Sequence, residues 1–322
     1  MTALLITLLP SLFGFPGAPL NSFSGIDLAP RQTVLDNLPL WSNDGGALEN
    51  FPDQHVFRDT SGDIVIVYRP ENDRSGRGTP RVIHYVLPNK VAPEISSFVH
   101  NGNNGLVDYV YKVRNESRAA QPITAWYLIG PSMDARVESD SGAWFGGATK
   151  TTFGIQVAIP YLPNGSYLSW MAQKQGISPG SAEGGFKISS PYLPGITTAY
   201  VRGNGTFTVP DELPLEVSDQ LAPVDNLAVS SFITIAVGPR FPPNASATTI
   251  LKGFRQDLFF LSEHSPQVLG DAEACKHLLV ILDECLSTGT ALCRIAPPQG
   301  ANLLSDITRA LQFDQQRINQ IR

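Results

Sequence analysis

Hydrophobic and polar residues alternate in short runs over most of the chain, which is the pattern of β-strands. The clearest run is 106–114, in which Val107, Tyr109, Tyr111 and Val113 alternate with mostly polar residues. A period of two places these four side chains on one face of a half-buried antiparallel strand. Further β-rich runs, separated by turn residues, cover 56–58, 64–68, 82–87, 123–129, 152–159, 167–172, 185–189, 197–201 and 231–237. Short strands separated by turn signals predict a sandwich or barrel.

The pattern changes after about residue 265, where hydrophobic positions recur with a helical period. One stripe of six side chains lies within residues 273–286. Its members are Cys275, Leu278, Leu279, Leu282, Cys285 and Leu286. A second stripe runs through residues 303–321, after the chain breakers Pro297, Pro298 and Gly300. Two amphipathic helices with a short connection predict an αα-hairpin. The predicted fold is therefore mainly β with a C-terminal α-helical hairpin.

The N-terminal region has the features of an exported protein. Residues 3–15 are mostly apolar, have the length of a signal-peptide core and are too short to span a membrane. A signal peptide also carries a positive n-region, and the first basic residue here is Arg31, so an apolar strand within the sheet is the alternative. The predicted segments are a candidate signal peptide (1–24), a linker or extended lead-in (25–50), a β-sandwich domain (51–260) and an α-helical hairpin (265–322).

Composition and charge exclude some classes of protein and some kinds of binding partner. The 322 residues are 42% hydrophobic and 16% charged, with 28 glycines and 26 prolines. These values argue against a coiled coil and against a disordered chain. The net charge of -6 and the absence of a basic run argue against nucleic acid as a partner. We expect a protein or polysaccharide surface ligand, no transmembrane span, and an extracellular or periplasmic location.

The three cysteines all lie near the C-terminus. Cys275 and Cys285 share one predicted helix, in which the rise per residue separates them by about 15 Å, too far for a disulfide. Cys285 and Cys293 flank the turn 287–290 and are the candidate disulfide of an exported protein. Three buried, reduced cysteines are the alternative. Without a Cys-x-x-Cys motif or paired histidines, we predict no metal site.

Two short motifs resemble catalytic ones. Residues 176–180 match G-x-S-x-G, but Ser178 precedes Pro179, which has no N–H to donate to an oxyanion. Residues 140–142 (Asp-Ser-Gly) resemble the active-site triplet of aspartic proteases, whose chemistry needs a second carboxylate. The nearest match to a second triplet, 59–62, carries an extra residue. We therefore predict no catalytic residue and no cofactor.

Trp144 is the remaining candidate binding residue. It lies beside Gly142, Gly146 and Gly147, and is the best placed of the four tryptophans for exposure. Exposed aromatic side chains of a secreted sandwich can bind sugars by stacking. The alternative is a structural role, because aromatic residues in strand patterns, such as Trp126, usually fill the core.

Several turn and strand motifs carry a resemblance to a known group of proteins. Residues 106–115 and 123–128 form a "Y-x-Y-x-V-x-N … I" pair, and residues 177–195 contain a "PG … GF … S … LPG" run. With the closing strand at 231–239, these motifs resemble uncharacterised exported bacterial proteins. The resemblance covers about residues 82–322. It implies an immunoglobulin-like antiparallel β-sandwich, often followed by a C-terminal helical hairpin, and it brings no catalytic residue.

The predicted function is a non-enzymatic, exported structural or recognition module. The loops are mostly Gly, Pro, Asn and Ser, and no acid/base pair, nucleophile or metal cluster stands out in the sequence. Loops on a rigid sandwich can nevertheless bind ligands. One alternative is a secreted hydrolase or carbohydrate-active protein whose site is assembled only by the fold. Another is an anchoring or assembly protein that docks through its C-terminal helices.

Overall fold

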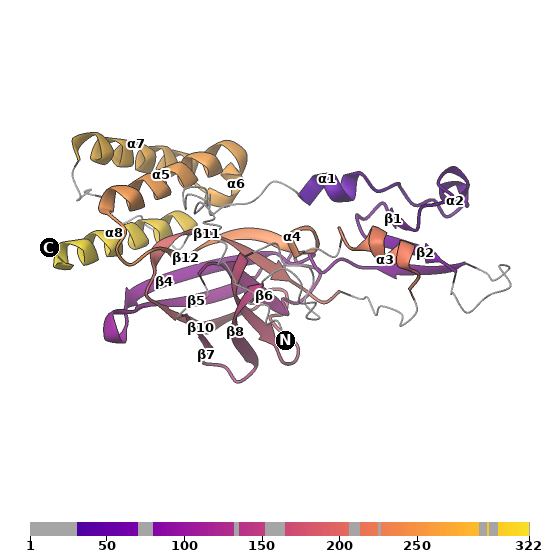
Figure 1. The fold of residues 1–322 in the computed structure, drawn as a ribbon, viewed down its shortest axis with the longest axis horizontal. Coiled ribbons are helices and arrows are strands. Elements are labelled where there is room, and N and C mark those ends of the chain that lie inside the picture. Colours follow the sequence, from indigo (N-terminus) through magenta and orange to yellow (C-terminus); the bar gives the residue numbers. More distant parts are fainter. Residues whose placement is uncertain are drawn as a thin grey trace, which may run out of the picture.

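The computed structural model describes residues 31–69, 80–131, 135–151, 165–205, 213–224, 227–289, 295 and 302–321. These residues form three antiparallel sheets, with the long helices toward the C-terminus (Figure 1). The prediction of a mainly β fold with C-terminal helices is confirmed. The predicted strand 152–159 lies outside the described residues.

A small sheet near the N-terminal end of the described chain has its own core. Its order is β1-β2-β3. Residues of β2 point alternately to two sides: Ile64 and Ile66 pack toward α3, and Val65 packs with Phe57 and with Ala47 of α2. Since both faces are covered, every residue of β2 is buried. The elements are α1 (Arg31–Asp36), α2 (Gly46–Asn50), β1 (Val56–Arg58), β2 (Ile64–Tyr68), β3 (Arg81–Tyr85) and α3 (Leu215–Leu221).

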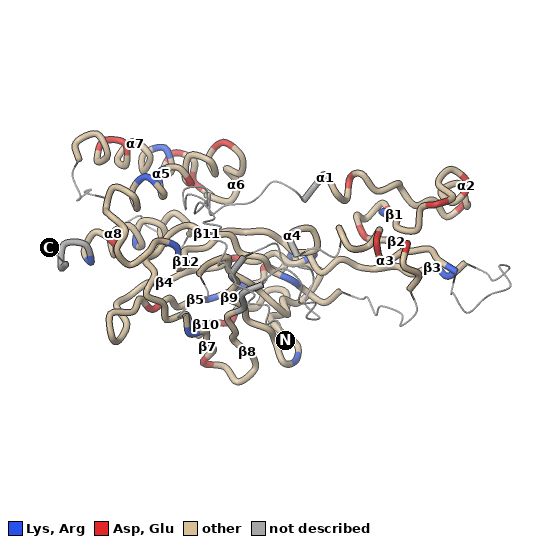
Figure 2. The backbone as a smooth tube through the Cα atoms, viewed as in Figure 1, with Lys and Arg blue, Asp and Glu red and all other residues tan. Residues whose placement is uncertain are grey.

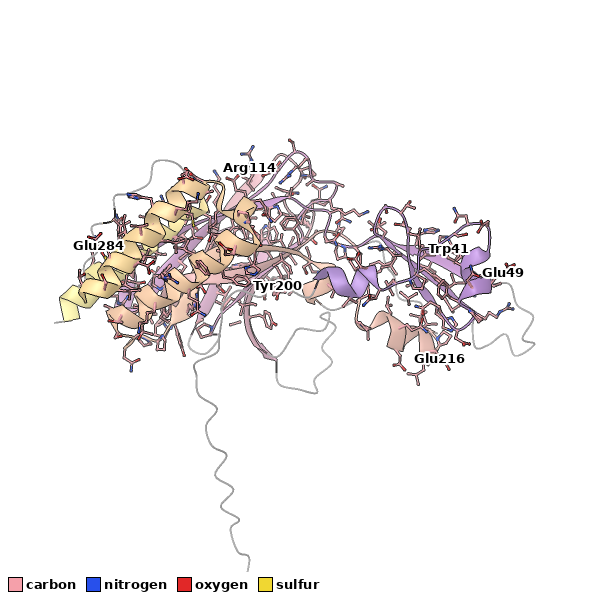
Figure 3. All side chains as sticks on the ribbon, turned by 90° about the horizontal axis from the view of Figure 1, so that it is seen from above. Trp41, Glu49, Arg114, Tyr200, Glu216 and Glu284 are labelled. Carbon is pink, nitrogen blue, oxygen red and sulfur yellow. The ribbon has the colours of Figure 1, made fainter. Side chains whose placement is uncertain are left out.

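This small unit changes the predicted division of the chain. The segment interpreted as a linker contributes α1 and α2, whose apolar residues pack on the small sheet. Strands β1 to β3 were expected within the sandwich, but they pair only with one another among the described strands. In Figure 3, Trp41 and Glu49 lie at one end of the elongated molecule and Glu284 lies toward the other.

Nine of the described strands form the two larger sheets. The four-stranded sheet has the order β4-β5-β10-β7 and the five-stranded sheet has the order β12-β11-β6-β9-β8. A 3-10 turn, η1 (Asn103–Gly105), connects β4 to β5, and the short helix α4 (Leu227–Ser230) precedes β12. The strands are β4 (Pro93–Asn101), β5 (Val107–Asn115), β6 (Ala125–Ile129), β7 (Arg136–Ser139), β8 (Trp144–Thr151), β9 (Gly165–Ala172), β10 (Ala182–Ser190), β11 (Leu193–Arg202) and β12 (Phe232–Phe241).

Aromatic side chains join these two sheets into one core. Trp126 and Trp170 of the five-stranded sheet stack with ring centroids 4.0 Å apart and an interplanar angle of 13°. Tyr111 and Phe186 of the four-stranded sheet each meet Trp126 edge-on at 5.4 Å. All four side chains are buried. The sheets therefore pack face to face, and the expectation that Trp126 fills the core is confirmed.

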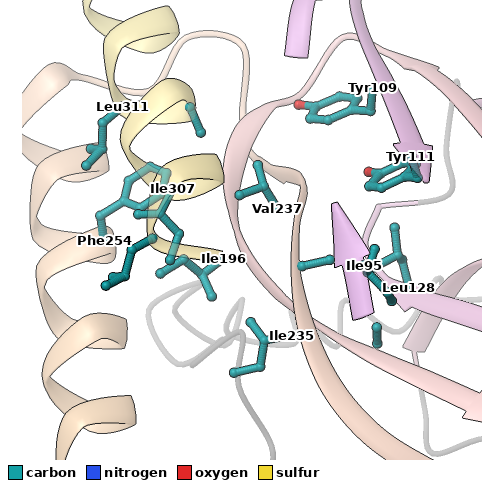
Figure 4. Packing of buried hydrophobic residues seen from close by; sticks show 14 of the residues in the cluster. Ile95, Tyr109, Tyr111, Leu128, Ile196, Ile235, Val237, Phe254, Ile307 and Leu311 are labelled. Atoms are coloured by element: carbon teal, nitrogen blue, oxygen red, sulfur yellow. The ribbon is translucent and has the colours of Figure 1, made fainter. Parts of the chain in front are cut away.

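Helices cover the outer side of β11 and β12. Every residue of β11 except Arg202 is buried, so the face turned away from the aromatic core must also be covered. Figure 4 shows Phe254 and Ile307 of two helices packed toward Ile196 and Val237 of these strands. The helices are α5 (Ala247–His264), α6 (Pro266–Leu269), α7 (Ala272–Thr288) and α8 (Leu303–Ile321).

The helical region differs from the predicted hairpin. Helix α5 begins at residue 247, inside the segment predicted as sandwich, and α7 packs against α5. Helix α8 instead packs on β4, β11 and β12. Side-chain oxygens of Ser246 and Asp271 accept from the N–H groups of Thr249 (3.1 Å) and Ala274 (2.9 Å) and so cap α5 and α7.

Candidate functional sites

The structure buries Trp144, so the prediction that this residue is exposed is wrong. The side chain is 4% exposed, and its ring meets Phe186 edge-on at 5.1 Å. Its indole N–H donates to Glu183 Oε2 (2.8 Å), which satisfies the one polar atom of the ring. The ring is part of the core, because the alternation of β8 turns position 144 inward.

The residue after Trp144 points the other way and is exposed. Phe145 is 62% exposed, and Met171, its direct partner across β8 and β9, is 42% exposed. Met171 in turn lies opposite Ala125 of β6. Directly opposed residues of antiparallel strands share a face. Ala125, Phe145 and Met171 thus form a row on the outer side of the five-stranded sheet, which we call the β8–β9 patch.

The G-x-S-x-G motif is a structural turn. Gly176 has φ +68°, and a Cβ there would overlap the carbonyl oxygen of Ile123, so this position requires glycine. Ser181 N–H donates to Ser178 O (3.0 Å), and Gly180 has φ +81°. The glycines of the motif therefore serve the turn that joins the paired residue Ile177 to β10.

The Asp-Ser-Gly motif lies at the end of β7. Asp140 N–H donates to Gly185 O, and Lys187 Nζ donates to Asp140 Oδ1 (2.7 Å). Both side chains of this ion pair are exposed. The hydrogen bond to Asp140 raises the pKa of Lys187. The Asp140 carboxylate is thus engaged in a surface ion pair between β7 and β10.

A buried ion pair connects α5 to the five-stranded sheet. The Arg240 guanidinium on β12 pairs with the Asp257 carboxylate on α5, and these side chains are 15% and 3% exposed. Arg240 Nη1 also donates to Ile196 O (3.0 Å). Burial lowers the pKa of Arg240 to about 10. Perturbed pKa values are common at functional sites, but here the shifted group fastens a helix to a sheet.

A polar cluster that sequence reasoning missed ties the small unit to the sandwich. Asn115 Oδ1 accepts from Ala92 N–H (3.1 Å), and its amide donates to Gln121 O (2.8 Å). The Gln121 amide donates to Leu87 O (3.2 Å) and Asn204 O (2.9 Å). These bonds fix the segment that leads from β3 to β4. Asn115 closes the "Y-x-Y-x-V-x-N" motif, so that motif also has a structural role.

The described residues bear to different extents on the predictions about metal ions, cysteine pairing and membrane spans. Among the described residues, no three His, Cys, Asp or Glu side chains gather as they would around a metal ion. Cys275 is a free, buried thiol, and its burial raises its pKa. Cys293, half of the candidate disulfide, lies outside the described residues. No helix in the described part of the chain is both long and apolar enough to cross a membrane.

Charge distribution and comparisons with known proteins add no catalytic assignment. Acidic and basic residues are interspersed along the described backbone, and on α5 and α7 both signs occur (Figure 2). No protein-family model matches the chain, and no curated protein shows significant similarity to it.

Proposed function

We propose that this protein is an exported, non-enzymatic recognition module that binds a protein ligand. The observation that carries the proposal is the β8–β9 patch, in which Phe145 and Met171 lie exposed side by side on strands whose inner face is packed with aromatic rings. Exposed apolar side chains that form a contiguous patch mark protein interaction sites. The packed core beneath the patch would hold it in one geometry.

The chemistry of the patch favours a protein over a polysaccharide. Methionine is flexible and polarisable and is common on surfaces that bind other proteins. A sugar-binding surface would pair an exposed ring with flanking polar groups, whereas Phe145 lies beside Met171 and, beyond it, Ala125, and Trp144 is buried. We further propose an immunoglobulin-like class for the sandwich, supported by two antiparallel sheets packed around buried tryptophans.

The alternative functions have less support from the described residues. The carboxylate of Asp140 and the turn at Ser178 serve structural bonds, which weakens the hydrolase hypothesis at those positions. Docking through the C-terminal helices, as the anchoring hypothesis proposes, requires an exposed apolar stripe on them. The apolar stripes of α5, α7 and α8 instead belong to the main core, and the large exposed apolar residues there are Phe259 and Val280.

Substitution of the patch residues tests the ligand hypothesis. A photo-crosslinking amino acid at position 145 of the full chain should capture one protein from the native exported fraction, and the same label at position 280 should not. With that partner purified, Phe145→Ser combined with Met171→Ser should raise Kd at least tenfold, because exposed apolar anchors dominate such interfaces. Thermal unfolding of this double variant should show a change in stability no larger than that of other surface substitutions.

The control is Val280→Ser, which removes an equally exposed apolar side chain from α7. It should leave Kd unchanged. Unchanged affinity in the double variant would refute the assignment of the patch. Binding to a cell-surface polysaccharide that is lost in the double variant, with no protein captured, would replace the protein ligand by a glycan. Turnover of a glycoside or ester substrate would favour the hydrolase.

The proposed compartment is tested through the cysteines. In an oxidising compartment we expect a disulfide between Cys285 and Cys293. Cys275 is not the expected partner, because it is a free, buried thiol and lies ten positions from Cys285 on the same helix. Peptide mapping of the non-reduced protein by mass spectrometry should show the Cys285–Cys293 cross-link. Cys275 should react with an alkylating agent only after denaturation. Three alkylated thiols in freshly isolated native-source protein would contradict the expected export.

A further inference from the structure

Helix α8 brings two buried carboxyl groups to its interface with the sheets. Its apolar side, which includes Leu304, Ile307 and Leu311, belongs to the main core. On the same helix, Asp306 and Asp314 are only 2% and 1% exposed. Buried carboxylates are costly unless they are paired and hydrogen-bonded, or protonated. The partners of these two groups therefore determine how the docking of α8 depends on pH.

Asp306 is held against β4. Ser97 N–H donates to Asp306 Oδ2 (2.6 Å), and Arg309, one turn along α8, pairs with the other oxygen. Glu94 of β4, an exposed like charge that pairs with Arg114 (3.7 Å), repels the same carboxylate. Burial outweighs the two favourable contacts and raises the pKa of Asp306 to about 6. At neutral pH the docked helix thus carries a buried charge that has only partial compensation.

Asp314 is less well compensated. Neither of its carboxylate oxygens has a hydrogen-bond partner in the described part of the chain. Asp314 interacts electrostatically with Tyr109 of β5, but the Tyr109 hydroxyl donates to Tyr192 O (2.7 Å). Arg317 attracts Asp314, but its guanidinium donates to the carbonyl oxygens of Gly105 and Leu106. Burial raises the pKa of Asp314 well above its usual range.

We propose that α8 is an acid-stabilised strap, which docks tightly on β4, β11 and β12 when Asp306 and Asp314 are protonated and loosens when they ionise. A carboxyl group that binds its proton more tightly in the docked state favours docking at low pH. That contribution is complete below the pKa of the undocked group, near 4, and is lost as the pH rises through the docked value. For Asp306 the change falls between about pH 4 and 6.

Hydrogen exchange of the full chain tests this strap directly. After correction for the intrinsic exchange rate, the opening equilibrium of the amides in residues 303–317 should be at least tenfold larger at pH 7.5 than at pH 4.5. Peptides from α7 are the internal reference, because its acidic side chains Glu273, Asp283 and Glu284 are exposed. They should change much less over the same pH range.

Two substitutions assign the effect to the named groups. Asp306→Asn and Asp314→Asn mimic the protonated carboxyls and should each reduce the opening of α8 at pH 7.5, and the double variant should remove most of its pH dependence. Glu284→Gln, at an exposed position of α7, should have no effect on α8. Asp314→Leu is the second variant if Asp314→Asn misfolds, since an apolar residue of similar volume needs no partner.

Two results would overturn the proposal. One is equal opening of α8 at both pH values in the wild-type chain, a measurement that needs no variant. The other is a double Asn variant that keeps the full pH dependence, which would place the titrating groups elsewhere. Neither outcome depends on whether the β8–β9 patch binds a ligand.

Discussion

Asp257→Ala is expected to lower the free energy of unfolding by about 3–5 kcal/mol, because removing one partner of a buried ion pair withdraws a counter-charge from the other. The charge left behind is the guanidinium of Arg240, which is only 15% exposed beneath α5. Its hydrogen bond to Ile196 O neutralises none of that charge. Urea unfolding followed by far-UV circular dichroism measures the loss.

Two controls separate the buried charge from the loss of a side chain. Asp283→Ala removes the same side chain from the ion pair with Arg255 on the surface of α5 and α7. We expect that loss to stay under about 1 kcal/mol, since exposed ion pairs contribute little. Arg240→Met combined with Asp257→Leu should recover most of the stability lost in Asp257→Ala. Equal losses in Asp257→Ala and Asp283→Ala would contradict the buried-charge explanation.

Sequence patterns predicted the strands whose inward positions are apolar. The run at 106–114 corresponds to β5, and the runs at 56–58 and 64–68 match β1 and β2. Strand β4 was missed because serines interrupt its pattern: Ser97 occupies a buried position of the strand. Strand β8 was missed because of its glycines. A Cβ on Gly146 would lie 2.7 Å from Val137 O, so the close approach of β7 requires that glycine.

Helix α5 could have been predicted. Ile250, Leu251, Phe254, Leu258 and Leu261 recur with helical spacing and are all buried. A glycine and neighbouring threonines obscured this stripe, and without α5 the two recognised helices could only be paired with each other. The predicted hairpin therefore pairs the wrong elements: α7 packs against α5, and α8 packs on the sheets.

The candidate sites depend on contacts that a single sequence does not reveal. Trp144 and Phe145 are adjacent, and only the phase of β8 decides which of them is buried. Asp306 accepts from Ser97, 209 positions away, and an acidic residue in an amphipathic helix is ordinarily expected on the solvent side. The sequence therefore predicts the scaffold better than the polar contacts that hold it together.

Trp126→Ala is expected to lower the free energy of unfolding by about 3–5 kcal/mol, because it opens a cavity at the centre of the sandwich. The lost ring stacks on Trp170 and meets Tyr111 and Phe186 edge-on, so aromatic contacts to both sheets disappear together. Relaxation can close little of that space, since the flanking rings are themselves buried in strands. Urea unfolding followed by circular dichroism is again suitable, because it does not depend on tryptophan emission.

Matched variants test the position of this ring. Trp126→Phe should lose less than Trp126→Ala, since it keeps an aromatic ring and removes an indole N–H that has no partner among the described residues. Trp41→Ala makes the same truncation in the small unit, where the ring is half-buried against Phe57. It should destabilise less, because a partly exposed ring leaves a smaller cavity. A larger loss for Trp41→Ala than for Trp126→Ala would mean that the small core, and not the stacked tryptophans, limits the stability of the fold.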